Sequence, residues 1–221
     1  KTAEIYYHLE NYEHLNFVKN TNKHEVFWLS NTEFIIKFSP PNNYYSKQEY
    51  RVCVRNGIKY KLFLNDYQQW LVYWSSNADS SLEVLDYVSL KDVVIDIGAN
   101  IGQTSLMVAD FLNGSGKVYS FEPYPSTFSL FCTNLDLNPL LKENIHHFNI
   151  GIGSQDTQLK MYQECITNTG GNRISIKEGS LKDAEGVVNI DMKTLDSFID
   201  SEGISPNKID LIKIDFIIII F

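Results

Sequence analysis

One short stretch constrains the fold of this chain more than any other, namely VVIDIGANIGQTS at residues 93–105. Its first five residues form the continuous apolar run expected of a strand that is buried on both faces. The acid Asp96 and the glycines Gly98 and Gly102 then lead into a polar helix start. A glycine turn at the end of a strand lets a ligand approach the backbone. The stretch therefore predicts a strand, a ligand-binding turn and a helix.

Strands and helices continue to alternate after this stretch. KVYSFEP and NIHHFNIGI predict a second and a third strand, and KIDLIKID predicts a fourth buried strand. Apolar residues at helical spacing follow each of the first two strands. Such alternation indicates a parallel sheet with helices on both faces, in which ligands bind beyond the carboxyl ends of the strands. We therefore expect an α/β fold with a Rossmann-like, doubly wound, mostly parallel sheet.

The segments on either side of these alternating elements have other patterns. YRVCVRNGIKYKLFL predicts a hairpin that turns at Asn56-Gly57. The runs LKMYQ, RISIKE and VVNIDM alternate and predict an antiparallel addition, followed by a short helix at TLDSFI. Periodicity further predicts a loose helix at residues 3–20, an alternating strand at 26–38, and short helices near 67–73 and 82–90.

Charge and cysteine content exclude several classes of protein. A net charge of −8 disfavours a nucleic-acid partner, because phosphate binding draws on clustered Lys and Arg. No stretch is long enough to predict a membrane span, and the first residues show no signal-peptide pattern. Cys53, Cys132 and Cys165 are far apart and odd in number, so they fit neither a zinc site nor a disulfide framework. We expect a protein of the reducing cytoplasm.

The turn also limits the choice of ligand. Its glycines are spaced G-x-x-x-G, so it lacks the third glycine of a dinucleotide fingerprint and the lysine of a P-loop. An acid as close as Asp96 would repel a pyrophosphate but suits S-adenosylmethionine, which carries a sulfonium, an amino group and no phosphate. Glu122, at the end of the second strand, suits the hydroxyls of a ribose. That geometry serves NAD equally well, so only the turn favours S-adenosylmethionine.

Several of these stretches together resemble a known family. DIGANIGQTS, YSFEPYP, NTGGNRIS, TLDSFI and IDLIKID occur in the order and with the spacing of FkbM-type class I methyltransferases, and the lead-in GIKYKLFLNDYQQW is also similar. The resemblance spans roughly residues 52–215. It implies a Rossmann-like fold, S-adenosyl-L-methionine as the cofactor, and methylation of a hydroxyl on a sugar, polysaccharide or secondary metabolite.

The resemblance also implies roles for individual residues. It places the methionine end of the cofactor at Asp96, Gly98, Asn100, Gly102 and Gln103, the ribose at Glu122, and the adenine beside Tyr124, Asn149 and Gly151. The glycines would be needed because a side chain there would collide with the ligand. Asp215, at the end of the fourth strand, would lie near the transferred methyl group and remove the proton from the acceptor. No cluster of metal ligands is evident.

The same resemblance implies a division of the chain. We expect an α+β N-terminal extension at residues 1–50 and a methyltransferase domain at 51–221. Within that domain the hairpin and helices occupy 51–91, the cofactor-binding core 92–215 and an atypical tail 216–221. The family continues after KID with a V-E-G-x-E element and further strands, whereas this chain reads FIIIIF. We therefore expect a C-terminally incomplete sheet whose fourth strand is an open, apolar edge and a site of self-association.

Simpler interpretations and two other functions remain open. Asp96 could tie down the turn through backbone amides. His146 and His147 alternate in a strand, so they point to opposite faces and cannot share a metal. Trp70 and Trp74 are spaced for the core side of a helix. The alternative functions are an NAD-binding oxidoreductase and a domain that binds S-adenosylmethionine without turnover. The acceptor, a small molecule or a glycan, is not identified by the sequence.

Overall fold

The central element of the fold is a four-stranded parallel sheet. The computed structural model describes residues 40–74, 80–163, 172–175, 187–215 and 219–220. The strands of the sheet are β3 (Val93–Ile97), β4 (Lys117–Phe121), β5 (Ile145–Phe148) and β10 (Leu211–Ile214), in the spatial order β10-β3-β4-β5. The chain runs outward from β3 to β5 and then returns to β10 on the other side of β3. The strand order therefore reverses between β3 and β10, where such sheets bind ligands.

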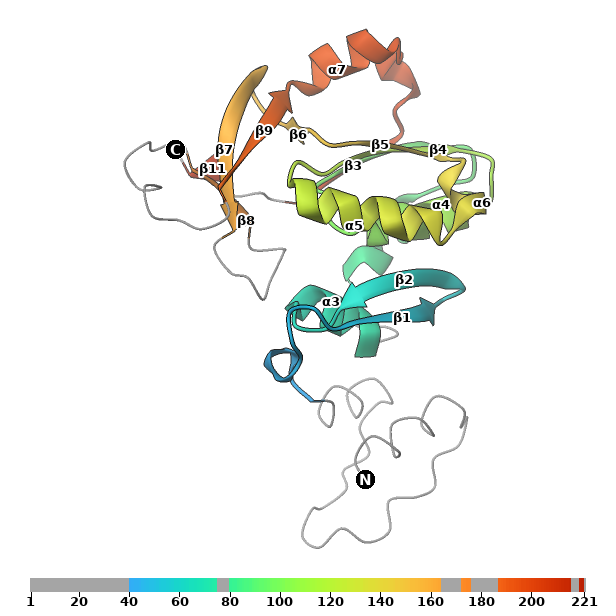
Figure 1. Cartoon of the computed structure of the whole chain (residues 1–221). Helices are drawn as coiled ribbons and strands as arrows, with labels where there is room; N and C mark the ends of the chain where they lie inside the picture. The colour runs from blue at the N-terminus through green and yellow to red at the C-terminus, as the bar shows by residue number, and fades with distance from the viewer. Residues whose placement is uncertain (1–39, 75–79, 164–171, 176–186, 216–218, 221) are drawn as a thin grey trace, which may run out of the picture.

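Helices cover both faces of this sheet. They are α4 (Gln103–Leu112), α5 (Pro125–Asp136), α6 (Pro139–Lys142) and α7 (Leu195–Glu202). In Figure 1, α7 lies above the sheet, and α4, α5 and α6 lie below it. α4 ends at Asn113, which adopts a left-handed conformation with φ of 46° and caps the helix. The α/β fold with a parallel central sheet, predicted from the sequence, is confirmed.

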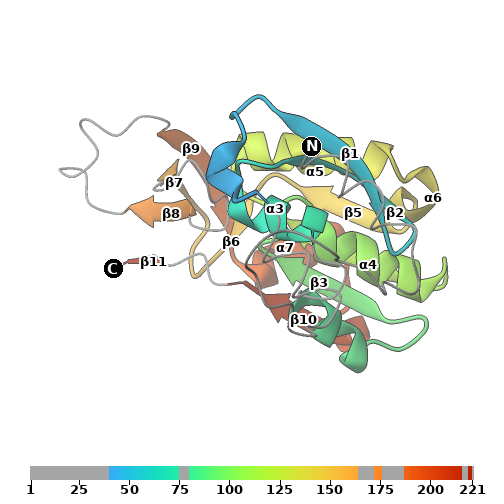
Figure 2. The ribbon, with the colours of Figure 1, turned by 90° about the horizontal axis from the view of Figure 1, so that it is seen from below.

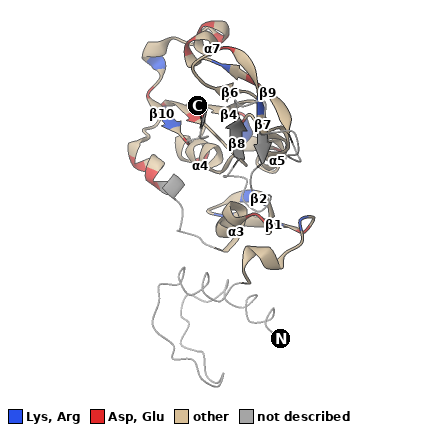
Figure 3. Cartoon of the chain, turned by 90° about the vertical axis from the view of Figure 1, so that its left-hand side faces the viewer, with Lys and Arg blue, Asp and Glu red and all other residues tan. Residues whose placement is uncertain are grey.

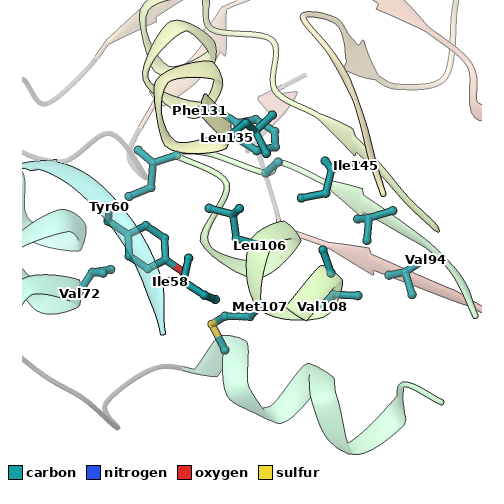
Figure 4. Packing of buried hydrophobic residues seen from close by; sticks show 14 of the residues in the cluster. Ile58, Tyr60, Val72, Val94, Leu106, Met107, Val108, Phe131, Leu135 and Ile145 are labelled. Carbon is teal, nitrogen blue, oxygen red and sulfur yellow. The ribbon is translucent and has the colours of Figure 1, made fainter. Parts of the chain in front are cut away.

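The alternation of side chains along each strand divides the core into two halves. Val94 and Val118 point toward α4 and α5, where they join Leu106 and Phe131 in one buried cluster (Figure 4). The alternate residues point to the other face and pack against Phe198 of α7, as Ile95, Ile97, Tyr119 and Phe121 do. Both faces of β3 and β4 are therefore buried, as the continuous apolar run predicted.

A hairpin forms a further layer beneath α4 and α5 (Figures 1 and 2). It consists of β1 (Tyr50–Arg55) and β2 (Ile58–Phe63), and α3 (Tyr67–Trp74) follows it. Two asparagines hold β2 in place, one in α5 and one just after its end. The amide of Asn138 accepts the N–H of Lys59 at 2.9 Å and donates to its carbonyl at 2.7 Å, and Asn134 accepts the N–H of Lys61 at 2.8 Å. These amides satisfy backbone groups that a third strand would otherwise pair.

The predicted hairpin and the helix near residues 67–73 are confirmed, and the helix near 82–90 differs in type. The turn is at Asn56-Gly57, with positive φ at both residues. The segment near 82–90 forms a 3-10 helix, η2 (Ser80–Tyr87), and its end is closed by a bond from the Val88 N–H to the Leu85 carbonyl. Two further 3-10 turns are η1 (Asn42–Tyr44) and η4 (Pro206–Lys208).

The antiparallel addition is a second sheet rather than an extension of the first. It contains β6 (Gly151–Ile152), β7 (Thr157–Gln163), β8 (Asn172–Ser175), β9 (Val188–Lys193) and β11 (Ile219–Ile220), in the order β11-β8-β7-β9-β6, with β7 antiparallel to β8 and β9. The predicted third strand is therefore divided between two sheets. Gly151 permits this, because a Cβ there would lie 2.4 Å from the sulfur of Met192 on β9.

The fourth strand departs from the prediction in its burial. KIDLIKID was expected to be buried, but Ile212 is 42% exposed and Ile214 is 58% exposed. The reason is topological: β10 is an edge strand of the central sheet in the described part of the chain. The prediction that this strand forms an open, apolar edge agrees with these exposures.

Some of the predicted elements lie outside the residues that the structure describes. The helix at 3–20, the strand at 26–38 and Cys165 all lie in ranges that the structure does not describe. Across the described ranges, no helix has the length and hydropathy needed to cross a bilayer.

Candidate functional site

The turn between β3 and α4 contains three residues in the left-handed region, with φ of 80° at Gly98, 52° at Asn100 and 86° at Gly102. The crowding at the two glycines comes from the protein itself. A Cβ at Gly102 would lie 2.1 Å from the ring of Phe131, and one at Gly98 would lie 3.2 Å from the Cβ of Asp215. Glycine is therefore required by the backbone conformation and by packing, before any ligand is considered.

A row of polar side chains crosses the sheet directly below this turn. Lys213 of β10 pairs in register with Asp96 of β3, which pairs with Ser120 of β4. Ser105 of α4 donates to Oδ2 of Asp96 at 2.6 Å and lies 2.8 Å from the hydroxyl of Ser120. Asp96 is 1% exposed. Its bonds among the described residues go to side chains, so it supports the turn from below without using the turn's own amides.

Lys213 neutralises this buried acid and connects it to the end of β10. Its ammonium lies 2.8 Å from Oδ1 of Asp96, 2.8 Å from Oδ2 of Asp215 and 3.4 Å from the carbonyl of Gly98. A lysine has three N–H donors, and each has an acceptor here. Burial alone would lower the pKa of Lys213, but the two carboxylates outweigh it and hold that pKa above its usual value. Lys213 therefore remains a cation at neutral pH.

Glu122 is the second buried acid, at the carboxyl end of β4. It is 5% exposed, and its two oxygens accept the backbone N–H groups of Asn100 at 3.0 Å and Tyr124 at 2.9 Å. Burial raises the pKa of Glu122 to about 7, and the two backbone hydrogen bonds limit the rise. Because each carboxylate oxygen has two acceptor sites, each can still accept a bond from a ligand hydroxyl.

The remaining predicted cofactor residues lie near the turn after β3 and the end of β4. Asn149, an exposed residue, donates its amide to the carbonyls of Glu122 and Pro123 at 2.8 and 3.0 Å, so it holds the end of β4 against the end of β5. Tyr124 is buried among Met161, Ile190 and Met192 of the second sheet, and burial raises its pKa. Gln103 is the first residue of α4. The cofactor roles of these residues stay predictions.

The structure brings the acids together and separates the two histidines. Asp96, Glu122 and Asp215 all lie at the carboxyl ends of the parallel strands, as the sequence predicted. His146 stacks on Tyr119 with ring centroids 4.8 Å apart, whereas His147 contacts Phe128 on the opposite face. Burial lowers the pKa of both histidines. Among the described residues, no group of three or more His, Cys, Asp or Glu could hold a metal ion.

Sequence patterns did not single out Lys213, Ser105 or the asparagines of α5. Lys213 could have been found from its spacing, because it is two residues before Asp215 and therefore shares its face of a strand. Finding its partnership with Asp96 required the knowledge that β10 pairs with β3.

These features define an α/β protein with a doubly wound parallel sheet and a candidate ligand site at the switch point of that sheet. Residues 96–216 match the methyltransferase FkbM domain. The chain belongs to this family.

Solved structures share shorter regions with the chain. A proposed transferase from Pyrococcus horikoshii is 29% identical over 48% of this chain and 37% of its own, with a TM-score of 0.38. TYW2 of P. horikoshii, in complex with MeSAdo, is 24% identical over 50% and 40%, with a TM-score of 0.37. A proposed rRNA methylase from Clostridium thermocellum is 22% identical over 33% and 38%, with a TM-score of 0.30. This chain thus covers well under two thirds of each, and TM-scores this low do not define the fold. No curated protein matches the chain.

Proposed function

We propose that this chain binds S-adenosyl-L-methionine and transfers its methyl group to a hydroxyl of a sugar, polysaccharide or secondary metabolite. The observation that carries the cofactor assignment is the environment of Glu122. Its carboxylate is buried at the end of β4, fixed by two backbone N–H groups and adjacent to the left-handed turn. A carboxylate held in this way can accept both hydroxyls of a ribose without further reorganisation.

The charges around the turn favour this cofactor over NAD. Three carboxylates, those of Asp96, Glu122 and Asp215, gather at the carboxyl ends of the strands, and Lys213 is the cation that contacts two of them. The excess of negative charge repels a pyrophosphate and attracts a sulfonium and an ammonium. The turn also lacks the third glycine that dinucleotide-binding turns use.

Methyl transfer requires mainly alignment and the removal of one proton. The cofactor supplies the methyl group on a positively charged sulfur. Holding the acceptor oxygen in line with that group contributes up to about 7–11 kcal/mol to the barrier reduction. The acceptor hydroxyl must lose its proton, and we assign this step to Asp215, whose side chain is 68% exposed at the end of β10.

The partners and compartment follow from charge and thiol chemistry. In Figure 3, Lys and Arg lie on several separate elements of the described chain, and the net charge of −8 disfavours the basic surface that nucleic-acid binding uses. Cys132 is a free thiol, which persists in a reducing environment. We therefore place the protein in the cytoplasm, with a small-molecule or glycan acceptor and no nucleic acid.

Calorimetric titration with S-adenosylhomocysteine tests the cofactor assignment. We expect micromolar binding that is stronger than the binding of NAD. Replacing Glu122 by glutamine should weaken it at least about tenfold, because each hydrogen bond to a charged group contributes about 1.5–3 kcal/mol. The matched control is Glu143→Gln, which makes the same change at an exposed site at the end of α6 and should leave the affinity unchanged. Tighter binding of NAD, or no binding by the folded chain, contradicts the proposal.

Self-association through β10 is a second proposal, supported by the exposure of Ile212 and Ile214 on an edge strand. We expect light scattering to show dimers or larger species at micromolar concentration. Replacing Ile212 by lysine should shift the protein to monomer, because a charge on an edge strand opposes strand pairing. Leu140→Lys on α6, where the residue is 78% exposed, is the control and should not change the mass. A monomeric parent chain contradicts the proposal.

A further inference from the structure

A second concave site lies behind the turn, on the side that faces the hairpin. It is a cavity of about 220 Å³ between the β2–α3 connection and the first turns of α5. Ile101, which is part of the turn between Asn100 and Gly102, forms part of its wall, as do Ser126 and Thr127 near the start of α5. The cavity is therefore adjacent to the cofactor site without containing its acids.

Three buried polar side chains line this cavity and have unused hydrogen-bonding capacity. Asn65 is 6% exposed, and the structure gives its side-chain amide no partner among the described residues. Thr127 is 4% exposed, and its hydroxyl is buried with no partner in the same part of the chain. The amide oxygen of Gln69 accepts the N–H of Phe63 at 2.8 Å, which orients the side chain and leaves its Nε2 group unused by that bond.

An unpartnered buried hydroxyl such as that of Thr127 is unusual in proteins. Roughly 90% or more of buried backbone groups, and the large majority of buried side-chain polar atoms, have a partner. The nearby Asn134 is buried too, and both ends of its amide are bonded, to the Lys61 N–H and to the Ile101 carbonyl. The fold can therefore satisfy a buried amide in this region. The unpartnered hydroxyl of Thr127, together with the unused bonding capacity of Asn65 and Gln69 around the same cavity, indicates that a ligand supplies their partners.

The lining selects a chemical class of ligand. Amides and a hydroxyl both donate and accept, as the hydroxyls of a polyol do. Phe63, Ile101 and Leu130 provide apolar wall for the carbon face of a ring. Lys47 and Asp66 contribute opposite charges, so the lining does not favour a net charge on the ligand. A volume of roughly seven water molecules accommodates a single substituted ring rather than an oligomer.

We propose that this cavity binds a neutral, hydroxyl-bearing ring and that this ring belongs to the methyl acceptor. The first part stands on the lining alone. The second part rests on the proposed function, because it places the acceptor beside the cofactor turn through the shared wall at Ile101.

Binding of simple rings to the full chain tests the proposal without requiring turnover. The probes are methyl α-D-glucopyranoside, methyl α-D-galactopyranoside and myo-inositol, with inorganic phosphate and tetramethylammonium as charged alternatives, all observed by saturation-transfer NMR. We expect millimolar binding of at least one neutral ring. Thr127→Val should weaken it about three- to tenfold, the share of one hydrogen bond. Thr133→Val, in the same helix but bonded to its own Ser129 carbonyl, should not. The melting temperature of Thr127→Val should not fall, because no bond within the protein is removed.

The outcomes separate this proposal from the proposed function. Failure of all three neutral rings to bind, or Thr127-dependent binding of a charged probe, overturns the ring assignment while leaving S-adenosylhomocysteine binding intact. A loss of S-adenosylhomocysteine affinity in Thr127→Val assigns the cavity to the cofactor and overturns it as well. If the parent chain binds a ring but no S-adenosylhomocysteine, the proposed function fails, and with it the assignment of the ring to an acceptor.

Discussion

Replacing Lys213 by methionine is expected to lower the free energy of unfolding by about 3–5 kcal/mol, the usual effect of removing one partner from a buried ion pair. Asp96 is 1% exposed and lies below the turn, with the Lys213 ammonium at 2.8 Å as its opposite charge. Methionine fills a similar volume but leaves this carboxylate uncompensated. Urea unfolding at pH 7, followed by circular dichroism, measures the change.

Two further variants show whether burial is the cause. Lys142→Met removes the same charge from an ion pair of similar length, 2.7 Å between Lys142 and Asp136, whose side chains are 44% and 67% exposed. Exposed pairs contribute at most about 1 kcal/mol, so the loss there should be small. Adding Asp96→Asn to Lys213→Met removes the stranded charge and should recover part of the stability. Equal losses for Lys142→Met and Lys213→Met would contradict the assignment of a buried, structurally required pair.

The features that sequence analysis predicted well are those that local chemistry determines. The apolar run of β3 and the glycine turn after it each depend on a few neighbouring residues. The hairpin turn at Asn56-Gly57 is of the same kind, because both residues tolerate positive φ. The convergence of Asp96, Glu122 and Asp215 followed from one further step, since the ends of parallel strands meet at one edge of the sheet.

The features that it missed depend on contacts between distant segments. Lys213 became visible only once β10 was known to pair with β3, 117 residues earlier in the chain. The division of the third strand into β5 and β6 depends on the pairing of Gly151 with Met192 of β9. The exposure of Ile214 follows from the position of β10 in the sheet. No periodicity within a strand contains this information.

The reason for the glycines illustrates the same limit. The sequence suggested that a side chain at Gly102 would collide with a ligand, whereas the structure shows that it would meet the ring of Phe131. The need for glycine at this position was predicted, and the structure adds a packing reason that the sequence did not contain. A pattern identifies where the backbone needs glycine, but the packing that requires it is a tertiary property.

Glu122 is expected to reduce the stability of the ligand-free protein as the pH rises from about 4.5 to 7. The pKa of its folded form is raised to about 7, mainly by burial, above the 4.5 of an ordinary glutamate. Between these values the folded state therefore binds more protons than the unfolded state, and stability falls as pH increases. This pKa shift corresponds to a loss of about 3 kcal/mol in the free energy of unfolding, and the loss is complete above pH 7. Glu122→Gln has no such charge, so its stability relative to the parent chain should grow by about this amount between pH 5 and 8.

The comparison of parent and variant isolates this one group. His146 and His147, whose pKa values burial lowers, make stability rise with pH, but they do so in both proteins and cancel in the difference. A difference that stays constant from pH 5 to 8 in urea titrations would show that Glu122 ionises normally. Cofactor binding should change in the opposite sense, because the ionised carboxylate is the stronger acceptor for ribose hydroxyls. The affinity of the parent chain for S-adenosylhomocysteine should rise through about pH 7 and that of Glu122→Gln should not, so that the charge which destabilises the empty site is the one that binds the cofactor.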